Sequence, residues 1–260
     1  MEHIKTDNYT IYNDNCINVL KNLPTGGVDL TVTSPPYNMN LRIRDGKFCK
    51  RTSEKNKIST KYNSFSDDLS MEEYYEFNKS VITELIRCSK LTFYNVQFLT
   101  GNKQALYKLI GEFSKNIKEF IIWDKNVGEP SIRGGVLNSR WEAILVLSSE
   151  EDALYREFKN STFGKGELDN IWNINRERSV NKEHGATFPE SLAAKIISNF
   201  CHEGSVILDP FMGTGTTGAA ALRTNNKFIG IELDKDYYDF CSNRFNDMDI
   251  GTDDDIFSFK

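Results

Sequence analysis

The segment Thr33-Ser34-Pro35-Pro36-Tyr37-Asn38 places a hydroxyl, a backbone carbonyl and an aromatic ring close together in the sequence. The Ser34 hydroxyl and the Pro35 carbonyl can both accept hydrogen bonds. Two acceptors directed at the exocyclic amino group of a nucleobase would draw its nitrogen toward tetrahedral geometry and receive the departing proton. The ring of Tyr37 would hold the base by stacking. The segment therefore favours chemistry at a base amino group, with a strand terminator beside a core tyrosine as the structural alternative.

The preceding residues explain how this segment would be positioned. The apolar run 28–32 predicts a short buried strand. Pro35 and Pro36 lack an N–H and fix φ at about −65°, so the strand cannot continue through them. A proline also holds the residue before it in an extended conformation. We expect a rigid corner at the carboxyl end of a strand, where open α/β sheets bind their ligands.

A second group of residues predicts a cofactor site. Residues 205–208 read as a strand, and 213–218 form a G-x-G-x-x-G turn that leads into a helix. Another strand, 228–231, ends at Glu232. Such glycines let the backbone approach a ligand, and a carboxylate at a strand end can bind both hydroxyls of a ribose. This βαβ unit indicates an adenosine-type cofactor, with a purely structural glycine turn as the less favoured alternative.

The remaining elements must position these two corners. The sequence predicts further strands at 9–12, 91–96, 119–123 and 141–147, and helices at 16–23, 70–89, 102–113, 191–197 and 236–245. Asp14 either caps the first helix or accepts a hydrogen bond from an amino group of the ligand. Little sheet-forming sequence follows the cofactor unit, so the missing strands must come from earlier in the chain. We therefore expect a permuted order in which both corners face one crevice.

The distribution of charge is more informative than its total. The chain of 260 residues carries a formal net charge of −5, yet eight Lys or Arg and only two acidic residues lie between Leu41 and Lys61. This patternless segment, 40–68, suggests contacts with phosphate groups or, alternatively, a solvated insertion. In the segment 148–185, basic and aromatic residues alternate. This favours either nucleic-acid contact or a peripheral subdomain that packs its aromatics inward.

Composition narrows the class of protein further. Hydrophobic residues make up 39% and charged residues 27%, as expected for one large α/β domain with insertions. The five cysteines and three histidines are scattered, which predicts reduced thiols and neither a disulfide framework nor a metal site. No apolar run approaches the roughly 20 residues of a membrane span, and the N-terminus lacks the apolar stretch of a signal peptide. We expect a cytoplasmic protein.

Taken together, the two motifs resemble those of the beta-class DNA amino-methyltransferases, which use S-adenosylmethionine to methylate cytosine N4 or adenine N6. Residues 33–37 match the catalytic motif and residues 209–217 match the cofactor motif, whose sequence here is Asp-Pro-Phe-Met-Gly-Thr-Gly-Thr-Thr. The order of the two motifs, catalytic before cofactor, defines the beta class. Residues 184–190 are similar to the family's histidine-proline-rich stretch, although Gly185 replaces the usual proline. The resemblance covers nearly the whole chain.

The resemblance implies a role for individual residues. By it, the catalytic pocket would be formed by Ser34, Pro35, Pro36 and Tyr37, and the cofactor would be bound by Asp14, Asp209, Phe211, Gly213, Thr214, Gly215, Thr216 and Glu232. Glu232 would bind the ribose hydroxyls, and Asp14 the adenine amino group. The target base would be flipped out of double-stranded DNA.

The resemblance also implies an α/β fold. It is a Rossmann-like, seven-stranded, mostly parallel sheet in circularly permuted order, with one antiparallel strand, that of Trp141. Residues 1–147 would form the catalytic half with its basic loop 40–68, residues 148–185 a target-recognition region, residues 186–246 the cofactor half, and residues 247–260 a flexible acidic tail. The family implies frequent homodimers and sometimes a cognate restriction endonuclease as a partner.

Several alternatives stay open from the sequence. Serine at position 34 favours cytosine N4, while adenine N6 is the second candidate. An NAD-dependent oxidoreductase would share the glycine turn and Glu232 but has no use for the Ser-Pro-Pro-Tyr segment. A methyltransferase acting on RNA or protein, and a catalytically silent DNA-binding module, are further possibilities.

The basic loop generates a first prediction. Replacing Lys55, Lys57 and Lys61 with Gln should weaken DNA binding and flatten its dependence on salt, because fewer counterions are released from the phosphates. Binding isotherms at several salt concentrations measure the slope. An unchanged slope would show that the loop makes no phosphate contacts.

Overall fold

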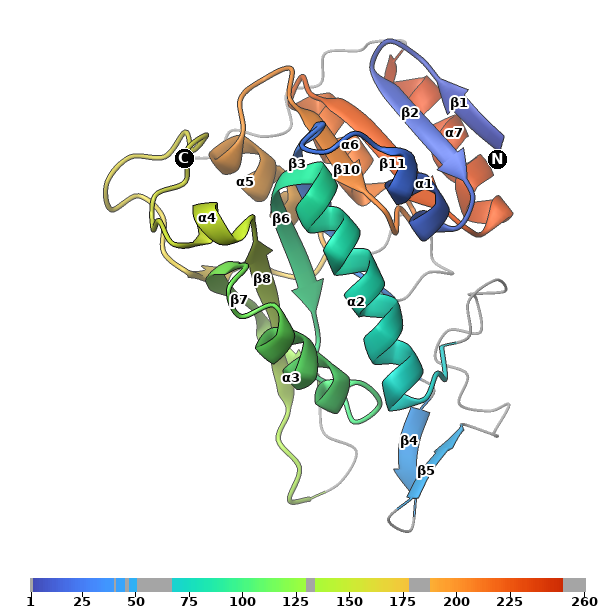
Figure 1. Ribbon diagram of the computed structural model, residues 1–260, viewed down its shortest axis with the longest axis vertical. Coiled ribbons are helices and arrows are strands. Elements are labelled where there is room, and N and C mark those ends of the chain that lie inside the picture. The colour runs from blue at the N-terminus through green and yellow to red at the C-terminus, as the bar shows by residue number, and fades with distance from the viewer. Residues whose placement is uncertain are drawn as a thin grey trace.

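The computed structural model describes residues 2–39, 41–44, 47–50, 67–129, 134–177 and 188–249. Within these residues one mixed sheet runs through the molecule in the order β1-β2-β11-β10-β3-β6-β8-β7-β9, with helices on both faces (Figure 1). Its strands are β1 Glu2–Lys5, β2 Tyr9–Asn13, β3 Val28–Thr33, β6 Ser89–Val96, β7 Ile117–Glu129, β8 Ser139–Leu147, β9 Ile171–Asn173, β10 Val206–Asp209 and β11 Lys227–Glu232.

Helices form one layer on each side of the sheet (Figure 1). One face is covered by α1 Cys16–Asn22, α2 Met71–Cys88 and α3 Lys103–Glu112, and the other by α5 Glu190–Phe200, α6 Thr216–Arg223 and α7 Lys235–Asp249. A single turn, α4 Glu150–Ala153, follows β8. Within the described part of the chain, no helix has both the length and the apolar character that crossing a bilayer requires.

Alternate residues of the central strands enter the two opposite cores. In β6, Phe93 packs under α5 while Tyr94 packs under α2, and in β8 the same is true of Ile144 and Leu145. All four side chains are buried. Because both faces of these strands are covered, apolar residues stand at consecutive positions, Phe93-Tyr94 in β6 and Ala143 to Leu147 in β8. This is why they were predictable.

The expected number of seven strands is wrong for the whole sheet, which has nine among the described residues. The strand of Trp141, β8, is antiparallel to both of its neighbours, β6 and β7, as predicted. The two additional strands are β1, antiparallel to β2, and β9, parallel to β7. The prediction of one antiparallel strand is therefore also wrong for the whole sheet. Both lie at the edges and are short. β1 is mostly exposed and β9 buries only Trp172, so neither produces a recognisable apolar pattern.

The basic segment 40–68 also contains structure that its sequence did not predict. β4 Leu41–Arg44 and β5 Lys47–Lys50 form a separate antiparallel pair. Each strand spans only four residues, too few for a periodic signal. The rest of the segment from 51 to 66 lies outside the described residues.

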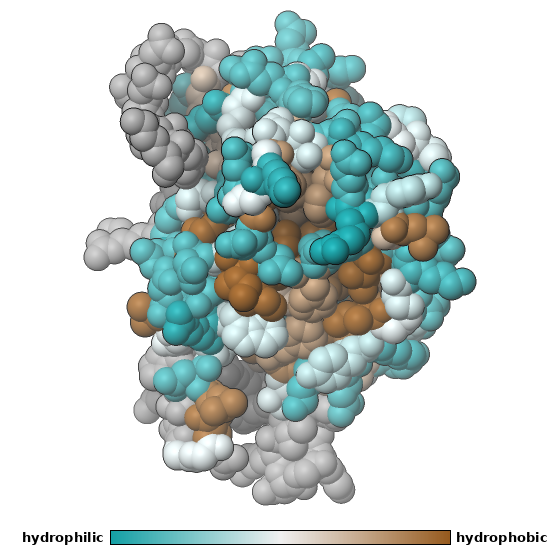
Figure 2. Space-filling model, turned by 90° about the vertical axis from the view of Figure 1, so that its left-hand side faces the viewer, coloured by the Kyte–Doolittle hydropathy of each residue, from teal (hydrophilic) through white to brown (hydrophobic). Residues whose placement is uncertain are grey.

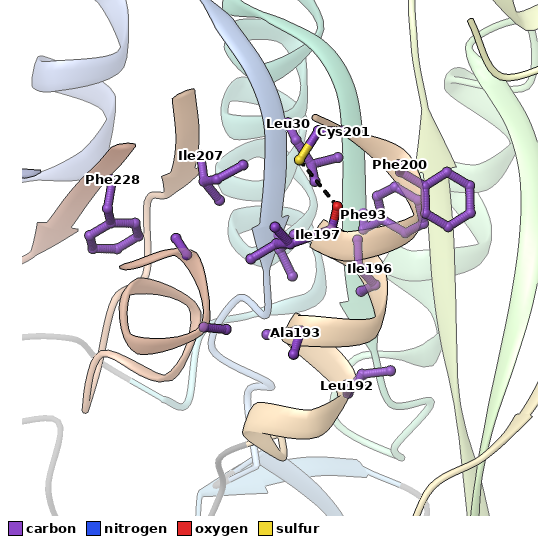
Figure 3. Close-up of a cluster of buried hydrophobic side chains, with 14 of the residues drawn as sticks. Leu30, Phe93, Leu192, Ala193, Ile196, Ile197, Phe200, Cys201, Ile207 and Phe228 are labelled. Atoms are coloured by element: carbon purple, nitrogen blue, oxygen red, sulfur yellow. Dashed lines mark hydrogen bonds between the residues drawn. The ribbon is translucent and has the colours of Figure 1, made fainter. Parts of the chain in front are cut away.

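Aromatic side chains of the segment 148–177 pack inward. Phe158 and Phe163 lie 4.9 and 5.3 Å, between ring centroids, from Phe200 of α5, and Trp172 is buried beside them. Figure 3 shows how α5 brings Ile196, Ile197 and Phe200 against residues of the strands. Tyr155 is the exception, with 58% of its surface exposed. The inward-packing interpretation of this segment therefore holds for its other aromatics.

The glycine turn is shaped by its contact with the last helix. A Cβ at Gly218 would come within 2.7 Å of the Phe228 ring and closer still to Phe245, and a Cβ at Gly215 would lie 2.7 Å from Phe245. Phe228 and Phe245 are fully buried and have little room to move. These two glycines are thus required for α6 to pack against α7 and β11.

This packing predicts opposite effects for two helical glycines. Gly218→Ala should lower the free energy of unfolding by about 1–3 kcal/mol, because the added methyl group overpacks the core. Gly111→Ala in α3 is the matched control, since nothing lies within 4 Å of its Cβ position. It should raise stability by about 1 kcal/mol through helix propensity. Urea denaturation measures both, and equal effects would contradict this account.

Candidate active site

The two motifs predicted from the sequence lie on adjacent strands. β3 pairs in parallel with β10, so both strands end at the same edge of the sheet. There the Thr33 hydroxyl donates a buried hydrogen bond of 2.7 Å to Asp209 Oδ1. Thr217, in the first turn of α6, donates to the Val32 carbonyl at 3.1 Å. The corner that begins at Ser34 is therefore joined directly to the turn that begins at Asp209.

Asp14 and Glu232 extend the same edge. β2 pairs in parallel with β11, and the Asp14 N–H donates to the Glu232 carbonyl at 3.2 Å. The Asp14 carboxylate accepts from the Asn15 N–H at 2.6 Å and from the Asn18 amide at 3.0 Å. The cap of α1 is Asn15, whose side chain accepts from the Ile17 N–H, so the capping role predicted for Asp14 is wrong. Asn15 is the N-cap because it lies one residue closer to the first turn of α1.

Glu232 is held by backbone donors in the glycine turn. Its Oε2 accepts from the Gly213 N–H at 2.8 Å, and its Oε1 accepts from the Asp234 N–H at 2.9 Å. Burial raises the pKa of Glu232 to about 7, although these hydrogen bonds oppose the shift. Burial likewise raises the pKa of Asp209 to about 6, against the bonds from Thr33 and the Phe211 N–H. Ionising either carboxyl therefore costs the fold free energy.

The other residues predicted to bind the cofactor surround this carboxylate. Gly213 and Gly215 both have positive φ, at 53° and 77°, which favours glycine. Gly215 caps α6, Thr216 begins it, and Thr214 is buried with its carbonyl accepting from Arg244 at 2.7 Å. Phe211 is half-buried, with its ring 5.9 Å from that of Phe77.

The backbone of the Ser-Pro-Pro-Tyr corner is held by its surroundings as well as by its prolines. The Pro36 carbonyl accepts from the Tyr74 hydroxyl at 2.8 Å, and the Tyr37 carbonyl accepts from the Asn102 amide at 2.8 Å. Asn38 has a φ of 56° and donates to two further carbonyls. Among the described residues, none donates a hydrogen bond to the Pro35 carbonyl.

Sequence reasoning missed Asn95 and Glu142, which contact the Tyr37 hydroxyl, and Lys125, which pairs with Glu142. This hydroxyl accepts from Ser34 Oγ at 2.7 Å and from Asn95 Nδ2 at 2.9 Å, and donates to Glu142 Oε2 at 2.9 Å. Lys125 Nζ lies 3.1 Å from Glu142 Oε1 in a buried ion pair. Burial, followed by the charge of Glu142, raises the pKa of Tyr37 well above its usual value, so the phenol stays protonated.

The signal for these residues was weak. Asn95, Lys125 and Glu142 come from β6, β7 and β8. Asn95 is a single polar residue in an apolar run, Glu142 stands next to one, and Lys125 lies between two other polar residues, Asp124 and Asn126. A charged residue in a buried strand usually needs a partner. This rule indicates that Glu142 needs a partner, but it does not identify Lys125 as that partner.

A pocket of about 590 Å³ lies elsewhere, beside β7 and β9. It is lined by Phe158, Phe163, Trp172 and Phe200 together with charged residues such as Arg156 and Lys165. Figure 2 shows hydrophobic residues gathered on this side of the molecule, surrounded by hydrophilic ones. The pocket does not include either motif. No group of three or more His, Cys, Asp or Glu in the described ranges is arranged to hold a metal ion.

Some predicted regions lie beyond what the structure describes. They are His184 to Thr187 of the histidine-proline-rich stretch and the acidic tail from residue 250 onward, in addition to loop residues 51–66. Pro189 is described, and it caps α5.

Comparison with known proteins identifies the family. The model of the N6/N4 DNA methylase family matches residues 28–243, which include both motifs. The chain belongs to this family. It is 28% identical to the type II methyltransferase M.HinfI of Haemophilus influenzae over 256 residues, 92% of this chain and 68% of that protein. It is 25% identical to M.HpaI of Haemophilus parainfluenzae, covering 92% of this chain and 74% of the relative.

Solved structures of DNA methylases share the fold. The cytosine-N4-specific PvuII DNA methyltransferase matches with a TM-score of 0.68 and 18% identity, over 97% of this chain and 89% of that one. TTHA0409 of Thermus thermophilus, a putative DNA modification methylase complexed with S-adenosyl-L-methionine, matches with a TM-score of 0.63 and 24% identity, over 93% and 95% of the two chains. These likenesses confirm an α/β fold with a mostly parallel sheet.

The raised pKa of Glu232 makes stability depend on pH. Between its unfolded value of 4.5 and its folded value of about 7, the folded state binds more protons, so stability falls as pH rises. We expect this residue alone to remove up to about 3 kcal/mol between pH of about 5 and 8, from about 1.4 kcal/mol per pKa unit. Glu232→Gln should flatten the slope, as measured by urea denaturation across pH. The exposed control Glu203→Gln should keep the wild-type slope, and an equal slope in all three proteins would contradict the assignment.

Proposed function

We propose that this DNA methylase transfers a methyl group from S-adenosylmethionine to the exocyclic amino nitrogen of a base in double-stranded DNA, with cytosine N4 as the favoured target. The hydrogen bond between Thr33 and Asp209 carries the proposal, because it places the catalytic corner next to the cofactor turn. Family membership supports the class of reaction. We also propose that the domain is a circularly permuted Rossmann-like one, because the Ser-Pro-Pro-Tyr segment precedes the glycine turn in the sequence.

The residues around Glu232 fit the cofactor. Each oxygen of its carboxylate accepts one backbone N–H and keeps a lone pair, so the two can accept from the two hydroxyls of a ribose. Asp14 would accept from the adenine amino group, while Asp209, Phe211 and Gly213 would line the methionine and adenosine. Gly215, Thr214 and Thr216 would shape the turn. When bound, S-adenosylmethionine supplies an electrophilic methyl group on a sulfonium.

The catalytic corner acts on the base. Ser34 Oγ and the Pro35 carbonyl accept hydrogen bonds from the amino group, which concentrates the nitrogen lone pair toward the methyl group. The Tyr37 ring holds the base flat while Pro36 fixes the backbone. A stacked base cannot reach this corner, so we propose that it is flipped out of the duplex.

We propose that exposed basic residues contact the DNA. The segment 148–185 is proposed as the target-recognition region and loop 40–68 as its helper. Because most aromatics of that segment pack inward, contacts fall to residues such as Arg156, Lys165 and the exposed Tyr155. The other proposed units are residues 1–147 and 186–246 as two halves of one domain and 247–260 as a tail.

Partners and location follow from the same proposal. The relatives M.HinfI and M.HpaI are type II methyltransferases by name, so a cognate restriction endonuclease is a proposed partner. A homodimer is also proposed, as is a location inside the cell on DNA. The enzyme does not need a membrane.

Identifying the methylated base tests the main proposal. DNA incubated with the purified protein and S-adenosylmethionine is digested to nucleosides and analysed by mass spectrometry. N4-methylcytosine supports the favoured target, while N6-methyladenine alone would reverse the order of the two candidates. Transfer to RNA or protein and not to DNA would overturn the proposal, as would binding of NAD in place of S-adenosylmethionine in calorimetry.

Ser34 should act on the base and not on the cofactor. Ser34→Ala is expected to lower kcat by about 100-fold or more, in the range of a lost preorganised group. The affinity for S-adenosylmethionine should change by less than about twofold, and calorimetry measures it. Ser80→Ala on the exposed face of α2 is the control and should match the wild type in both. Equal loss of cofactor binding and turnover in Ser34→Ala would contradict this role.

A further inference from the structure

We propose that Glu142 is a positioning residue that sets the direction of the hydrogen bonds at Ser34 and so makes the serine oxygen an acceptor toward the base. The inference rests on the proposed function and deepens it. It starts from the chain of contacts in which Ser34 Oγ donates to Tyr37 Oη at 2.7 Å and Tyr37 Oη donates to Glu142 Oε2 at 2.9 Å.

The direction of this chain follows from the chemistry of its end. A carboxylate has no proton to donate, so Tyr37 must donate its single proton to Glu142. The Tyr37 oxygen is then left only with lone pairs. It accepts from Ser34 and also from Asn95 Nδ2 at 2.9 Å. Ser34 Oγ has two acceptors within reach, Tyr37 Oη at 2.7 Å and the Asn95 carbonyl at 3.4 Å. The shorter contact takes the Ser34 proton, which leaves the lone pairs of Ser34 Oγ for the amino group of a base.

Two further groups, Lys125 and Asn95, donate to the oxygens of Glu142. Lys125 Nζ lies 3.1 Å from Oε1, with its side chain fully buried. Asn95 Nδ2 donates to Oε2 at 2.7 Å. Since both neighbours only donate at these contacts, Glu142 is surrounded by donors on both of its oxygens.

The arrangement is costly for stability, which favours a functional reason for it. A buried ion pair often contributes less than apolar residues of similar size would. In addition, Asn95 Oδ1 is buried and no donor in the described ranges reaches it. An unsatisfied buried acceptor costs about 1–3 kcal/mol. The amide of Asn95 is thus used for its two donor hydrogens, to Tyr37 and to Glu142.

The isosteric change Glu142→Gln tests the direction of the chain. A glutamine amide can donate to Tyr37 and thereby turn the Tyr37 proton toward Ser34. That proton then occupies a lone pair of Ser34 Oγ and turns the Ser34 proton toward the Asn95 carbonyl or the base. We expect kcat to fall by about 10- to 100-fold, as for a misaligned reacting group. The KM values for DNA and S-adenosylmethionine should stay within about threefold. Glu142→Asp, which still only accepts, should retain more activity than the isosteric glutamine.

A matched control separates this role from a structural one. Asp29, near the start of β3 and so at the other end of that strand from Ser34, forms an ion pair of 2.7 Å with Lys90 and accepts from the Val206 N–H at 2.9 Å. Asp29→Asn weakens that pair and should destabilise the protein without changing kcat. Thermal melting of all variants shows how much stability each one loses.

A double-mutant cycle with Ser34 tests whether Glu142 acts through that residue. If Glu142 acts through Ser34, Glu142→Gln should change kcat less than about twofold when Ser34 is already alanine. Single-turnover transfer of a tritiated methyl group measures these slow rates. Additive losses would overturn the inference, as would a kcat for Glu142→Gln equal to that of Asp29→Asn.

Tyr37→Phe provides an independent test should Glu142→Gln fail to fold. It keeps the ring for stacking and removes the hydroxyl that links Ser34 to Glu142. A fall in kcat of about 10-fold or more with unchanged cofactor binding is expected, and wild-type kcat would overturn the inference. If the wild-type protein itself transfers no methyl group to DNA, the proposed function fails instead, so the two failures are distinguishable.

Discussion

One buried hydrogen bond, from Thr33 Oγ1 to Asp209 Oδ1, joins two strands whose residues lie 176 positions apart in the sequence. A buried carboxylate needs such a donor, because an unpaired charge in the interior costs several kcal/mol. By donating this hydrogen bond to Asp209, Thr33 also fixes the position of the end of β3 relative to the end of β10. Ser34 follows immediately and so starts the corner at the level where the glycine turn begins. The relative placement of the two motifs depends on this contact.

The edge of the sheet concentrates buried charge that the rest of the fold must stabilise. Asp209, Glu232 and the pair Lys125–Glu142 all lie within or next to the two motifs, and all are buried. The helices on both faces compensate through apolar cores of ordinary density, such as the cluster beneath α5 (Figure 3). The apolar cores beside the middle of the sheet thus stabilise the protein. The buried polar groups at one edge of the sheet destabilise it, as expected where function requires polar groups.

The sequence predicted those parts of the fold that have strong local signals. β3 and β10 are apolar runs closed by prolines or followed by glycines, and their adjacency was inferred from the shortage of strands after Glu232. The Glu142 network could not be predicted, because it depends on register: Trp123 of β7 lies opposite Glu142, and Asn95 of β6 lies opposite Ile144. A single sequence does not give the register between strands, even between β7 and β8, which follow one another along the chain.

The same limit explains the segment after β8. A mixture of basic and aromatic residues is compatible with a surface for nucleic acid and with a small core, since both require rings beside cations. Most of these rings pack around Phe200 and so form a small core. Phe200 lies in α5, well beyond the segment itself. Short edge strands such as β9 are similarly set by the neighbour that they join and not by their own residues.

The pairing of β2 with β11 has a consequence for how the protein is made. Tyr9 to Asn13 lie beside Phe228 to Glu232, so β2 pairs with a strand that comes more than 200 residues later in the sequence (Figure 1). During synthesis β2 therefore has an open edge toward β11 until those later residues have left the ribosome. Such non-local pairing slows folding and exposes unpaired strand edges to aggregation. We expect the nascent chain to need chaperones that shield this edge.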